Sequence, residues 1–344
     1  MPAPCAEESL LQLTIHCGEE AFTALHAEWN PLLQRARLDT LFLTWEFQTT
    51  WWRHFSEGEM IVLAYRAGED LVAIVPLYVT TASGQRRVRL IGGTEVADYL
   101  DFIVAPGYEE EVIEQTLAWL NGPHAPAWDL LEWVNVPEEG VLYRYFAPIA
   151  RERGWQVESR QEDVCPIIPL PETWEGYLAL LNKHQRHEIR RKLRRIEEQA
   201  RVRWYIVDGS HDLPTEVDRF ITLHELSSPN KDAFMTDEMK RFFHALAQAL
   251  LDAGWLQLSF IEVNGAVAAS MYCFDYQDRI LVYNSGYDPD QYAHLSPGIV
   301  LLSRCIEHAI VTGKRYFDFM QGDEEYKYRF GGQDTCVYRI TTKR

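Results

Sequence analysis

Lysine is missing from the first 182 residues of this 344-residue chain, and acidic side chains dominate the same stretch. Residues 1–165 carry 26 acidic and 11 basic side chains, whereas residues 166–344 carry 25 acidic and 22 basic ones. The formal net charge of −18 therefore lies mainly in the first half. Because negative charge repels phosphate groups, we expect neither DNA nor an anionic membrane on the first half, and we place any anionic ligand on the second.

The sequence also lacks the marks of an exported or membrane-spanning protein. Its cysteines form no C-x-x-C pair and no disulfide-framework spacing, which indicates thiols in a reducing compartment. They are Cys5, Cys17, Cys165, Cys273, Cys305 and Cys336. The first residues lack the basic segment and apolar run of a signal peptide, and no apolar stretch reaches the ~18 residues that cross a bilayer. We therefore expect a cytoplasmic protein without a membrane span.

Motifs of several enzyme classes are absent as well. The chain contains no H-E-x-x-H, no P-loop G-x-x-x-x-G-K and no G-x-S-x-G sequence. His184 and His187 are spaced by one helical turn, but no third ligand has metal-site spacing, so we expect no metal. Cys273 and Cys305 lie in apolar runs, which favours a place in the core over a role as nucleophile.

The length and the 47% hydrophobic content suit two domains that each bury a core. In the first half, periodicity and turn residues predict helices over 19–34, 44–55, 108–120 and 139–153, and strands in a hairpin around 67–70 and at 88–93, 99–104 and 128–136. In the second half they predict helices over 174–195, 214–227, 236–253 and 297–311, and strands at 202–208, three times within 256–288, at 316–320 and at 336–340.

The two halves thus repeat one order of elements. Residues 159–172 are polar and then proline-rich, which predicts a crossover between domains. Alternating helices and strands indicate an α/β (α+β) fold in which a mixed, bent sheet is flanked by helices. We expect two tandem domains of this kind, residues 1–165 and residues 166–344.

One candidate site begins the helix at 297–311. Ser296 can cap this helix, Pro297 suits its first turn, and Gly298 lets a ligand approach the backbone. Unpaired N–H groups and the helix dipole favour a phosphate or pyrophosphate there, which makes residues 295–299 (Leu295, Ser296, Pro297, Gly298 and Ile299) candidate cofactor-binding residues. The alternative is a core helix that is simply well capped.

A second candidate follows the strand at 316–320. The loop from Gln321 to Gly331 contains Asp323, Glu324, Tyr326 and Lys327. A carboxylate there could take a proton from an attacking amine or hydroxyl, and a lysine could offset charge on an acyl-transfer intermediate or a phosphate. The alternative is a solvated, charged turn.

Several motifs, taken in order, resemble a known group. They are Y-N-S-G-Y-D at 283–288, S-P-G at 296–298, F-D-F-M-x-G-D-E-x-Y-K at 317–327, W-x-x-Y-L-x-x-L…R-x-x-x-R-R at 174–191 and Gly92-Gly93…Asp98-Tyr99-x-Asp101. Together they are similar to the acetyltransferase domain of CelD-type cellulose-biosynthesis proteins, in the GNAT superfamily, and to the related FemAB peptidyltransferases. The resemblance covers residues 40–340 and implies two tandem GNAT-like domains.

The resemblance implies a sheet that opens between two central strands to hold an acyl-CoA thioester, with acetyl-CoA as the expected donor and its pyrophosphate at 295–300. The acceptor, a small molecule or saccharide, would attack directly through an amine or hydroxyl. Asp323 or Glu324 would act as base, Tyr326 and Asn284 would position the acceptor beside Tyr283, and Lys327 would stabilise charge. Arg186 and Arg190 also match the group's pattern and would bind substrate.

The sequence departs from the group at the pyrophosphate loop. It has H-L-S-P-G-I at 294–299 where typical GNAT enzymes have Q/R-x-x-G-x-G/A. FemAB-like relatives use aminoacyl-tRNA as donor, so a tRNA-dependent peptidyltransferase is an alternative function, and a non-catalytic binding module is another. The basic run from Lys183 to Arg195 is either a docking face for tRNA, CoA phosphates or a sugar nucleotide, or a solvated face.

The first half has no S/T-P-G helix start, so we expect it to act as scaffold or on the acceptor side. Nothing in the sequence points to an oligomeric state.

Overall fold

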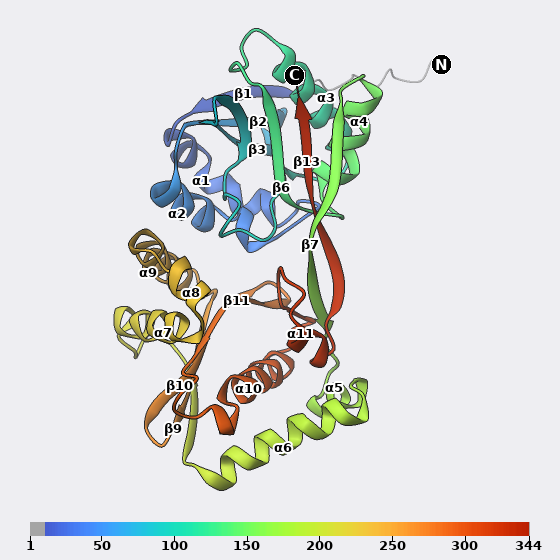
Figure 1. The fold of residues 1–344 in the computed structure, drawn as a ribbon. Coiled ribbons are helices and arrows are strands. Elements are labelled where there is room, and N and C mark those ends of the chain that lie inside the picture. The colour runs from blue at the N-terminus through green and yellow to red at the C-terminus, as the bar shows by residue number, and fades with distance from the viewer. Residues whose placement is uncertain (1–10, 344) are drawn as a thin grey trace. The chain divides into compact units, whose positions relative to one another are not determined.

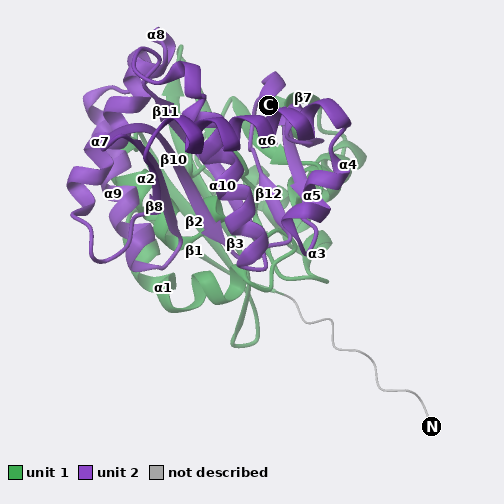
Figure 2. Ribbon diagram, turned by 90° about the horizontal axis from the view of Figure 1, so that it is seen from below, with its two compact units in different colours: residues 1–163, 336–344 green, residues 164–335 purple. Residues whose placement is uncertain are grey.

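A computed structural model describes residues 11–343 of the chain (Figure 1). It contains two compact units: unit 1 comprises residues up to 163 together with those from 336 on, and unit 2 comprises residues 164–335 (Figure 2). The expected division after residue 165 therefore lies two residues from the observed one, but the end of the chain returns to unit 1. Cys5 lies outside the described residues.

Unit 1 is built on a sheet whose strand order is β1-β2-β3-β4-β6-β13, with β5 paired to β3. All of these pairs are antiparallel except β4 with β6, which is parallel. Its strands are β1 (Gln12–Cys17), β2 (Glu59–Ala67), β3 (Asp70–Ala82), β4 (Gln85–Leu90), β5 (Ile103–Val104), β6 (Leu130–Pro137) and most of β13 (Gln333–Lys343). Its helices are α1 (Glu20–Leu33), η1 (Leu41–Leu43), α2 (Trp45–Phe55), α3 (Glu109–Asn121), the π-helical η2 (Leu142–Phe146) and α4 (Ala147–Glu152).

Local signals in unit 1 act as the sequence predicts. The Thr44 hydroxyl accepts the N–H of Phe47 at 3.3 Å and caps α2. Trp51 and Trp52 are 4% and 5% exposed, so both belong to the core.

Asp101 is fully buried, and its carboxylate accepts the N–H groups of Val141 and Leu142 at 2.5 and 2.9 Å. Burial raises the pKa of Asp101 to about 7, against the pull of these hydrogen bonds.

Unit 2 repeats the plan with the strand order β7-β12-β11-β10-β9-β8, in which β11 and β12 are parallel. Its strands are the end of β7 (Val157–Pro169), β8 (Val202–Ile206), β9 (Leu256–Val263), β10 (Ala266–Tyr276), β11 (Arg279–Tyr287) and β12 (Tyr316–Asp318). Its helices are α5 (Trp174–Leu180), α6 (Lys183–Gln199), α7 (Leu213–Ser227), α8 (Pro229–Phe234), α9 (Asp237–Asp252), η3 (Ala293–Leu295), α10 (Pro297–Val311) and α11 (Glu325–Arg329).

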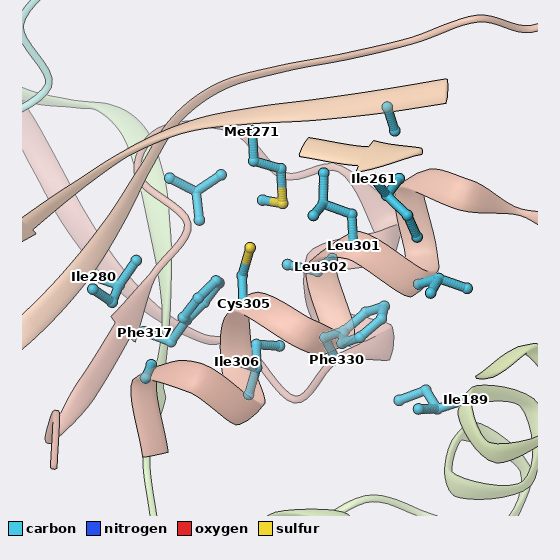
Figure 3. Close-up of a cluster of buried hydrophobic side chains, with 14 of the residues drawn as sticks. Ile189, Ile261, Met271, Ile280, Leu301, Leu302, Cys305, Ile306, Phe317 and Phe330 are labelled. Atoms are coloured by element: carbon cyan, nitrogen blue, oxygen red, sulfur yellow. The ribbon is translucent and has the colours of Figure 1, made fainter. Parts of the chain in front are cut away.

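The sheet of unit 2 separates two apolar layers. Helices α7, α8 and α9 lie on one face, and α10 and α6 lie on the other (Figure 1). Because side chains alternate along a strand, Met271 and Cys273 of β10 face α10, while Tyr272 and Phe274 pack among aromatic rings on the opposite face. Figure 3 shows the layer around α10, where Met271, Leu301 and Cys305 meet. Each large aliphatic side chain buried there contributes about 1.5–3 kcal/mol.

The two thiols in this layer are core groups, as predicted. Cys273 and Cys305 are both fully buried, and burial raises the pKa of each, that of Cys305 to about 12. Neither supplies a thiolate at neutral pH.

The chain passes from unit 1 to unit 2 within the predicted crossover at 159–172, but as a strand. These residues form most of β7, a strand that begins in unit 1 and ends in unit 2. The polar residues of this strand are exposed or partly exposed, and Glu162 pairs with Arg339 of β13. The strand β1 and the short helices α8 and α11 were not predicted. The observed architecture is the expected mixed α/β fold, in which each unit contributes a similarly ordered set of strands, flanked by helices. None of the helices between residues 11 and 343 combines the length and apolar character that a bilayer crossing requires.

Candidate functional site

The candidate site in unit 2 lies where two parallel strands part. Residues 279–281 of β11 pair with residues 316–318 of β12. Beyond Asp318 the chain follows β7 instead, because the N–H of Phe319 donates to the Pro166 carbonyl at 2.9 Å and that of Gly322 to the Val164 carbonyl at 3.0 Å. Residues 282–287 of β11 therefore lack a partner from β12 on this side.

Backbone groups of β11 point toward this opening. A bulge in the β10–β11 pairing leaves Tyr283 as the extra residue on β11. The Tyr287 N–H donates to Ser227 Oγ at 2.9 Å, and the Tyr287 carbonyl accepts from the same hydroxyl at 3.3 Å, so both groups point away from β10. Since alternate residues of a strand direct their backbone groups to the same edge, those of Ser285 do so too.

A lysine that was not predicted meets this edge. Lys231 of α8 donates its Nζ to the carbonyl of Ser285. Burial lowers the pKa of Lys231, and the charge of Glu324 partly offsets this effect. A largely buried amine that meets a strand edge in this way is a functional candidate.

His224 of α7 adds a second unpredicted side chain. It is 1% exposed, and its Nε2 lies 3.0 Å from Oδ1 of Asn284, so Nε2 carries the proton and donates. Burial, together with the charge of Lys231, lowers the pKa of His224 to about 4. The imidazole is therefore neutral at pH 7 and fixes the orientation of Asn284, a predicted acceptor-positioning residue.

Gly286 explains how α7 comes so close to β11. A Cβ at this glycine would lie 2.4 Å from the backbone nitrogen of His224 and 2.5 Å from the carbonyl carbon of Leu223. Only a residue without a side chain permits this approach. The glycine of Y-N-S-G-Y-D thus serves to place His224 against the strand.

Lys327 holds the loop after β12 rather than facing the opening. It is 2% exposed, and its Nζ donates to the carbonyls of Met320, Gln321 and Gly322 at 3.3, 2.5 and 3.1 Å. It also pairs with Glu324 at 2.9 Å. With its donors used in this way, Lys327 positions the loop, and the expected role in stabilising an intermediate does not fit its geometry.

The two predicted bases differ in how they are held. Asp323 and Glu324 are both exposed, but only Glu324 is anchored, through Lys327. The ring of Tyr326 packs edge-on against Phe319, with the ring centroids 5.9 Å apart. Burial, helped by the charge of Glu324, raises the pKa of Tyr326, so its hydroxyl stays protonated and can donate a hydrogen bond.

Three predicted substrate-binding residues have other partners. The Tyr283 ring packs against Phe274, with the centroids 4.8 Å apart. Arg186 donates to the carbonyls of Leu178 and Leu181 at 3.3 and 3.4 Å, at the end of α5. Arg190 pairs with Glu175 at 2.5 Å on the surface. The two arginines therefore tie α6 to α5.

The start of α10 offers one free amide, not a row of them. Ser296 lies in the left-handed region (φ 56°, ψ 52°) and its side chain makes no cap, so the predicted Ser296 cap is wrong. Its carbonyl accepts the N–H groups of Ile299 and Val300 at 3.1 and 3.2 Å. Leu295 and Ser296 also donate their N–H groups to nearby carbonyls. Between residues 295 and 300, Gly298 alone has an N–H without a partner in the described structure, and no atom lies within 4 Å of its Cβ position.

Arginine approaches this amide from a neighbouring helix. Nη2 of Arg195 in α6 lies 3.4 Å from Ser296 Oγ, and its Nε is buried without a hydrogen-bond partner. The first turn of α10 contains no acidic residue. A cation, a free amide and the positive end of a helix dipole together favour an anion. Among residues 11–343, no three His, Cys, Asp or Glu side chains gather as metal ligands would.

Comparison with known proteins finds a related domain in unit 2. Residues 183–328 match the family model of the acetyltransferase (GNAT) domain. The match is to this domain and not to the CelD-type group in particular, so that finer resemblance stays a prediction. A search of curated protein sequences found no significant match.

Solved structures share the fold across most of the chain. FemX superposes with a TM-score of 0.66 at 9% identity, covering 91% of this chain and 95% of its own. The C-terminal domain of a putative lysylphosphatidylglycerol synthetase from Agrobacterium fabrum gives 0.55 at 10%, covering 92% of each chain. The L-PGS structure from Bacillus licheniformis gives 0.51 at 10%, covering 80% of this chain and 82% of its own. At these identities the likeness concerns the fold alone.

Proposed function

We propose that the protein is an acyltransferase that moves an acyl group from a phosphopantetheine thioester to an amine or hydroxyl. The sequence predicts acyl-CoA, with acetyl as the acyl group, as the form of this donor. One observation carries the proposal: β12 leaves β11 after residue 281, beside a helix start with a free N–H at Gly298. The GNAT-domain match over residues 183–328 supports the same reaction class.

The donor would enter unit 2 with its phosphate at α10 and its thioester beside β11. Gly298 binds the phosphate through its free N–H, and the guanidinium of Arg195, next to Ser296, supplies positive charge there. The extended pantetheine arm lies along residues 282–287 of β11, which have no partner from β12. Binding of this kind sets the reacting carbonyl at a fixed distance from the acceptor, which supplies much of the rate.

The chemical step is direct attack. The acceptor nitrogen or oxygen attacks the thioester carbon, a new C–N or C–O bond forms, and the C–S bond breaks. The carboxylate of Glu324 takes the proton from the attacking atom, and the leaving thiolate takes up a proton from solvent, to which Glu324 later returns its own. Lys231 faces the charge that develops on the carbonyl oxygen, because its ammonium already lies against the edge of β11.

Two further residues hold this arrangement. Asn284, oriented by His224, hydrogen-bonds the acceptor, and Tyr326 donates its hydroxyl to the thiolate or to the acceptor. Lys327 is a positioning residue, since it acts through the loop and through Glu324.

A donor titration tests the proposal. Acetyl-phosphopantetheine and acetyl-CoA are titrated by calorimetry and by thermal shift, and a positive donor is then incubated with pools of amines and sugars while thiol release is measured. Binding to the native state raises stability by ~2.7 kcal/mol at a hundred times the dissociation constant. Saturable binding of either donor with acceptor-dependent thiol release is expected. Absence of binding by both donors contradicts the proposal.

A further inference from the structure

Helix α6 carries more positive charge than its neighbours neutralise. Seven Lys and Arg side chains lie between residues 183 and 195. Three are paired with carboxylates: Arg190 with Glu175 (2.5 Å), Arg191 with Glu188 (2.7 Å) and Arg194 with Glu198 (3.6 Å). The remaining four have no acidic partner in the described part of the chain: Lys183, Arg186, Lys192 and Arg195.

Two of these cations lie in a cluster of like charges. Burial is the main cause that lowers the pKa of Lys192, and the charges of Arg191, Arg195 and Arg329 lower it further against the opposing effect of Glu188. We call Arg191, Lys192, Arg195 and Arg329 the α6 cation cluster. Arg195 joins it to Ser296 at the start of α10. Arg191 and Arg329 are paired with Glu188 and Glu325, both at 2.7 Å, so Lys192 and Arg195 carry the charge that an anionic partner would offset.

The adjoining phosphate site suits one phosphate better than two. Typical cradles for larger phosphate groups use several free N–H groups at once. Here the N–H groups of Ile299 and Val300 are already bonded to the Ser296 carbonyl, which leaves that of Gly298. CoA brings a pyrophosphate and a further phosphate, whereas phosphopantetheine on a protein has a single phosphodiester.

We propose that the donor arrives as phosphopantetheine attached to an acidic carrier protein, which docks on the α6 cation cluster. This inference rests on the proposed acyltransferase function and names the donor's partner. Asp and Glu side chains of the carrier would pair with Lys192 and its neighbours, and the phosphodiester would reach Gly298. A nucleic acid is disfavoured, since it binds through many phosphates along an extended basic surface, and the chain's net charge is −18.

Binding measurements with matched variants test the docking surface. Dissociation constants are measured by calorimetry for an acidic holo acyl carrier protein, for phosphopantetheine and for CoA, with the wild type, Lys192→Glu and Arg194→Gln. The carrier is expected to bind at least tenfold more tightly than either small thiol. Lys192→Glu should remove that advantage and leave phosphopantetheine binding within twofold of the wild type. Arg194→Gln is the control, because Arg194 lies on the same helix but outside the cluster and is paired with Glu198.

The possible results separate the two proposals. Three results would overturn the docking surface while leaving the thioester site in place. The first is binding of the carrier no tighter than that of phosphopantetheine, and the second is tighter binding of CoA than of the carrier. The third is salt-sensitive binding of charged tRNA in place of the carrier. Failure of all three phosphopantetheine probes overturns the acyltransferase as well. If Lys192→Glu does not fold, Lys192→Gln and the loss of carrier affinity between 50 and 200 mM salt give the same information.

Discussion

Both units contain a parallel pair of strands joined through a helix, and the two pairs end differently. In unit 1 the β4–β6 pairing stops at Val88 and Leu131, and the next residues, Arg89 and Glu132, are joined by a hydrogen bond of 2.8 Å. In unit 2 the β11–β12 pairing stops at Leu281, and no such bridge joins the following residues within the described structure. The same topology is therefore closed by an ion pair in one unit and left open in the other.

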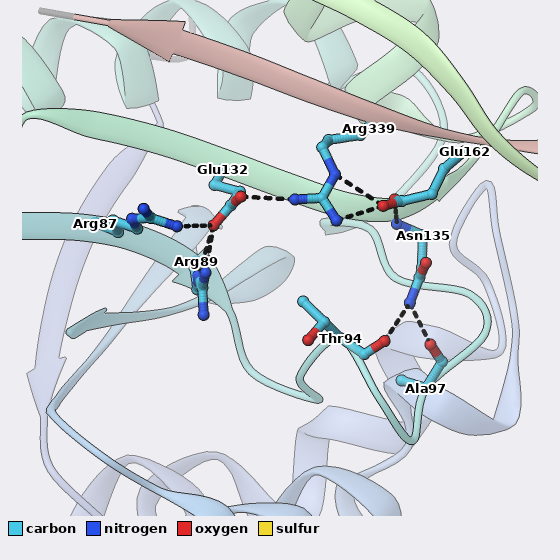
Figure 4. Close-up of polar contacts among 8 residues, drawn as sticks. All are labelled: Arg87, Arg89, Thr94, Ala97, Glu132, Asn135, Glu162 and Arg339. Carbon is cyan, nitrogen blue, oxygen red and sulfur yellow. Dashed lines mark hydrogen bonds and ion pairs between the residues drawn. The ribbon is translucent and has the colours of Figure 1, made fainter. Parts of the chain in front are cut away.

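The closure in unit 1 involves more than one pair. Glu132 also accepts from Arg87 at 3.3 Å and from Arg339 at 2.7 Å, and Arg339 pairs in turn with Glu162 (Figure 4). Burial alone would raise the pKa of Glu132, but the hydrogen bond and charge of Arg89, with the charges of the other two arginines, hold that pKa below its ordinary value. The carboxylate is thus ionised and bridges the two strands where their pairing stops.

The two intervening helices differ in the same sense. The first turn of α3 in unit 1 contains Glu109, Glu110 and Glu111, and Glu109 accepts the N–H of Gly107 at 2.7 Å. The first turn of α10 in unit 2 contains no acid and has Arg195 beside it. Since an acidic first turn already satisfies a helix N-terminus and repels phosphate, we place the donor in unit 2 alone.

The largest expected effect is on catalysis and comes from Glu324, the proposed base beside the open β11–β12 pair. Glu324→Gln keeps a hydrogen-bond acceptor for Lys327 but removes the proton acceptor, and kcat should fall by about 10²–10⁴-fold. Asp323→Asn is the matched control and should change kcat less than threefold, because Asp323 is not anchored. Steady-state thiol release measures both. Equal losses in the two variants would contradict the choice of Glu324.

Removing the carboxylate that bridges the β4–β6 pair should lower the free energy of unfolding. Glu132→Gln leaves three half-buried arginines around a neutral group, and the free energy of unfolding should fall by roughly 2–4 kcal/mol, a value reduced for partial exposure. The Arg66–Glu28 pair in the same unit is more exposed, so Glu28→Gln should cost less than about 1 kcal/mol. Urea denaturation compares them, and similar costs would argue against a special role for Glu132.

Making α10 resemble α3 should weaken donor binding without loss of stability. Gly298→Glu places an acid in the first turn where no atom lies within 4 Å of the Cβ position. The dissociation constant of phosphopantetheine should rise about tenfold, equivalent to ~1.4 kcal/mol. Gly298→Gln adds the same bulk without the charge and should bind within threefold of wild type. If the two variants bind alike, bulk and not charge is responsible.

The smallest effect concerns the pH dependence of unit 2. An unfolded histidine takes up a proton near pH 6.5, whereas folded His224 resists protonation until about pH 4. The stability it contributes is therefore present above pH 6.5 and is lost as the pH falls toward 4. At pH 5.5 the loss is about 1.4 kcal/mol relative to His224→Gln, which does not titrate there. Urea denaturation at pH 7.5 and 5.5 measures it, and equal pH slopes would contradict the burial argument.

Much of the fold could be predicted because its signals are local. Thr44 before α2 and the Asn264-Gly265 turn between β9 and β10 each specify their structure within a few residues. The strand β7 could not be recognised this way, since Glu162 and the Cys165 carbonyl find their partners on β13, 170 or more residues later. Pairing over such distances leaves no periodic mark on a single segment.

The candidate site follows the same rule: side chains with a local sequence signal were predicted, and those brought in from distant segments were not. The positions of Gly298 and Glu324 were predicted from adjacent sequence. Lys231 and His224 were missed, because each comes from a helix more than 50 residues before the strand it meets and carries no local motif. The position of Lys327 was predicted but its partners were not. They are three backbone carbonyls, and every residue has a carbonyl, so no residue type marks them in a sequence.

Direct observation of a bound donor tests the contrast between the two units most simply. A crystal structure is determined with S-acetonyl-phosphopantetheine, a thioether that cannot transfer its acyl mimic. The account predicts the phosphate beside the Gly298 N–H, the arm along residues 282–287 of β11, and an unchanged Arg89–Glu132 bridge in unit 1. A donor seated between β4 and β6, with that bridge broken, would contradict it.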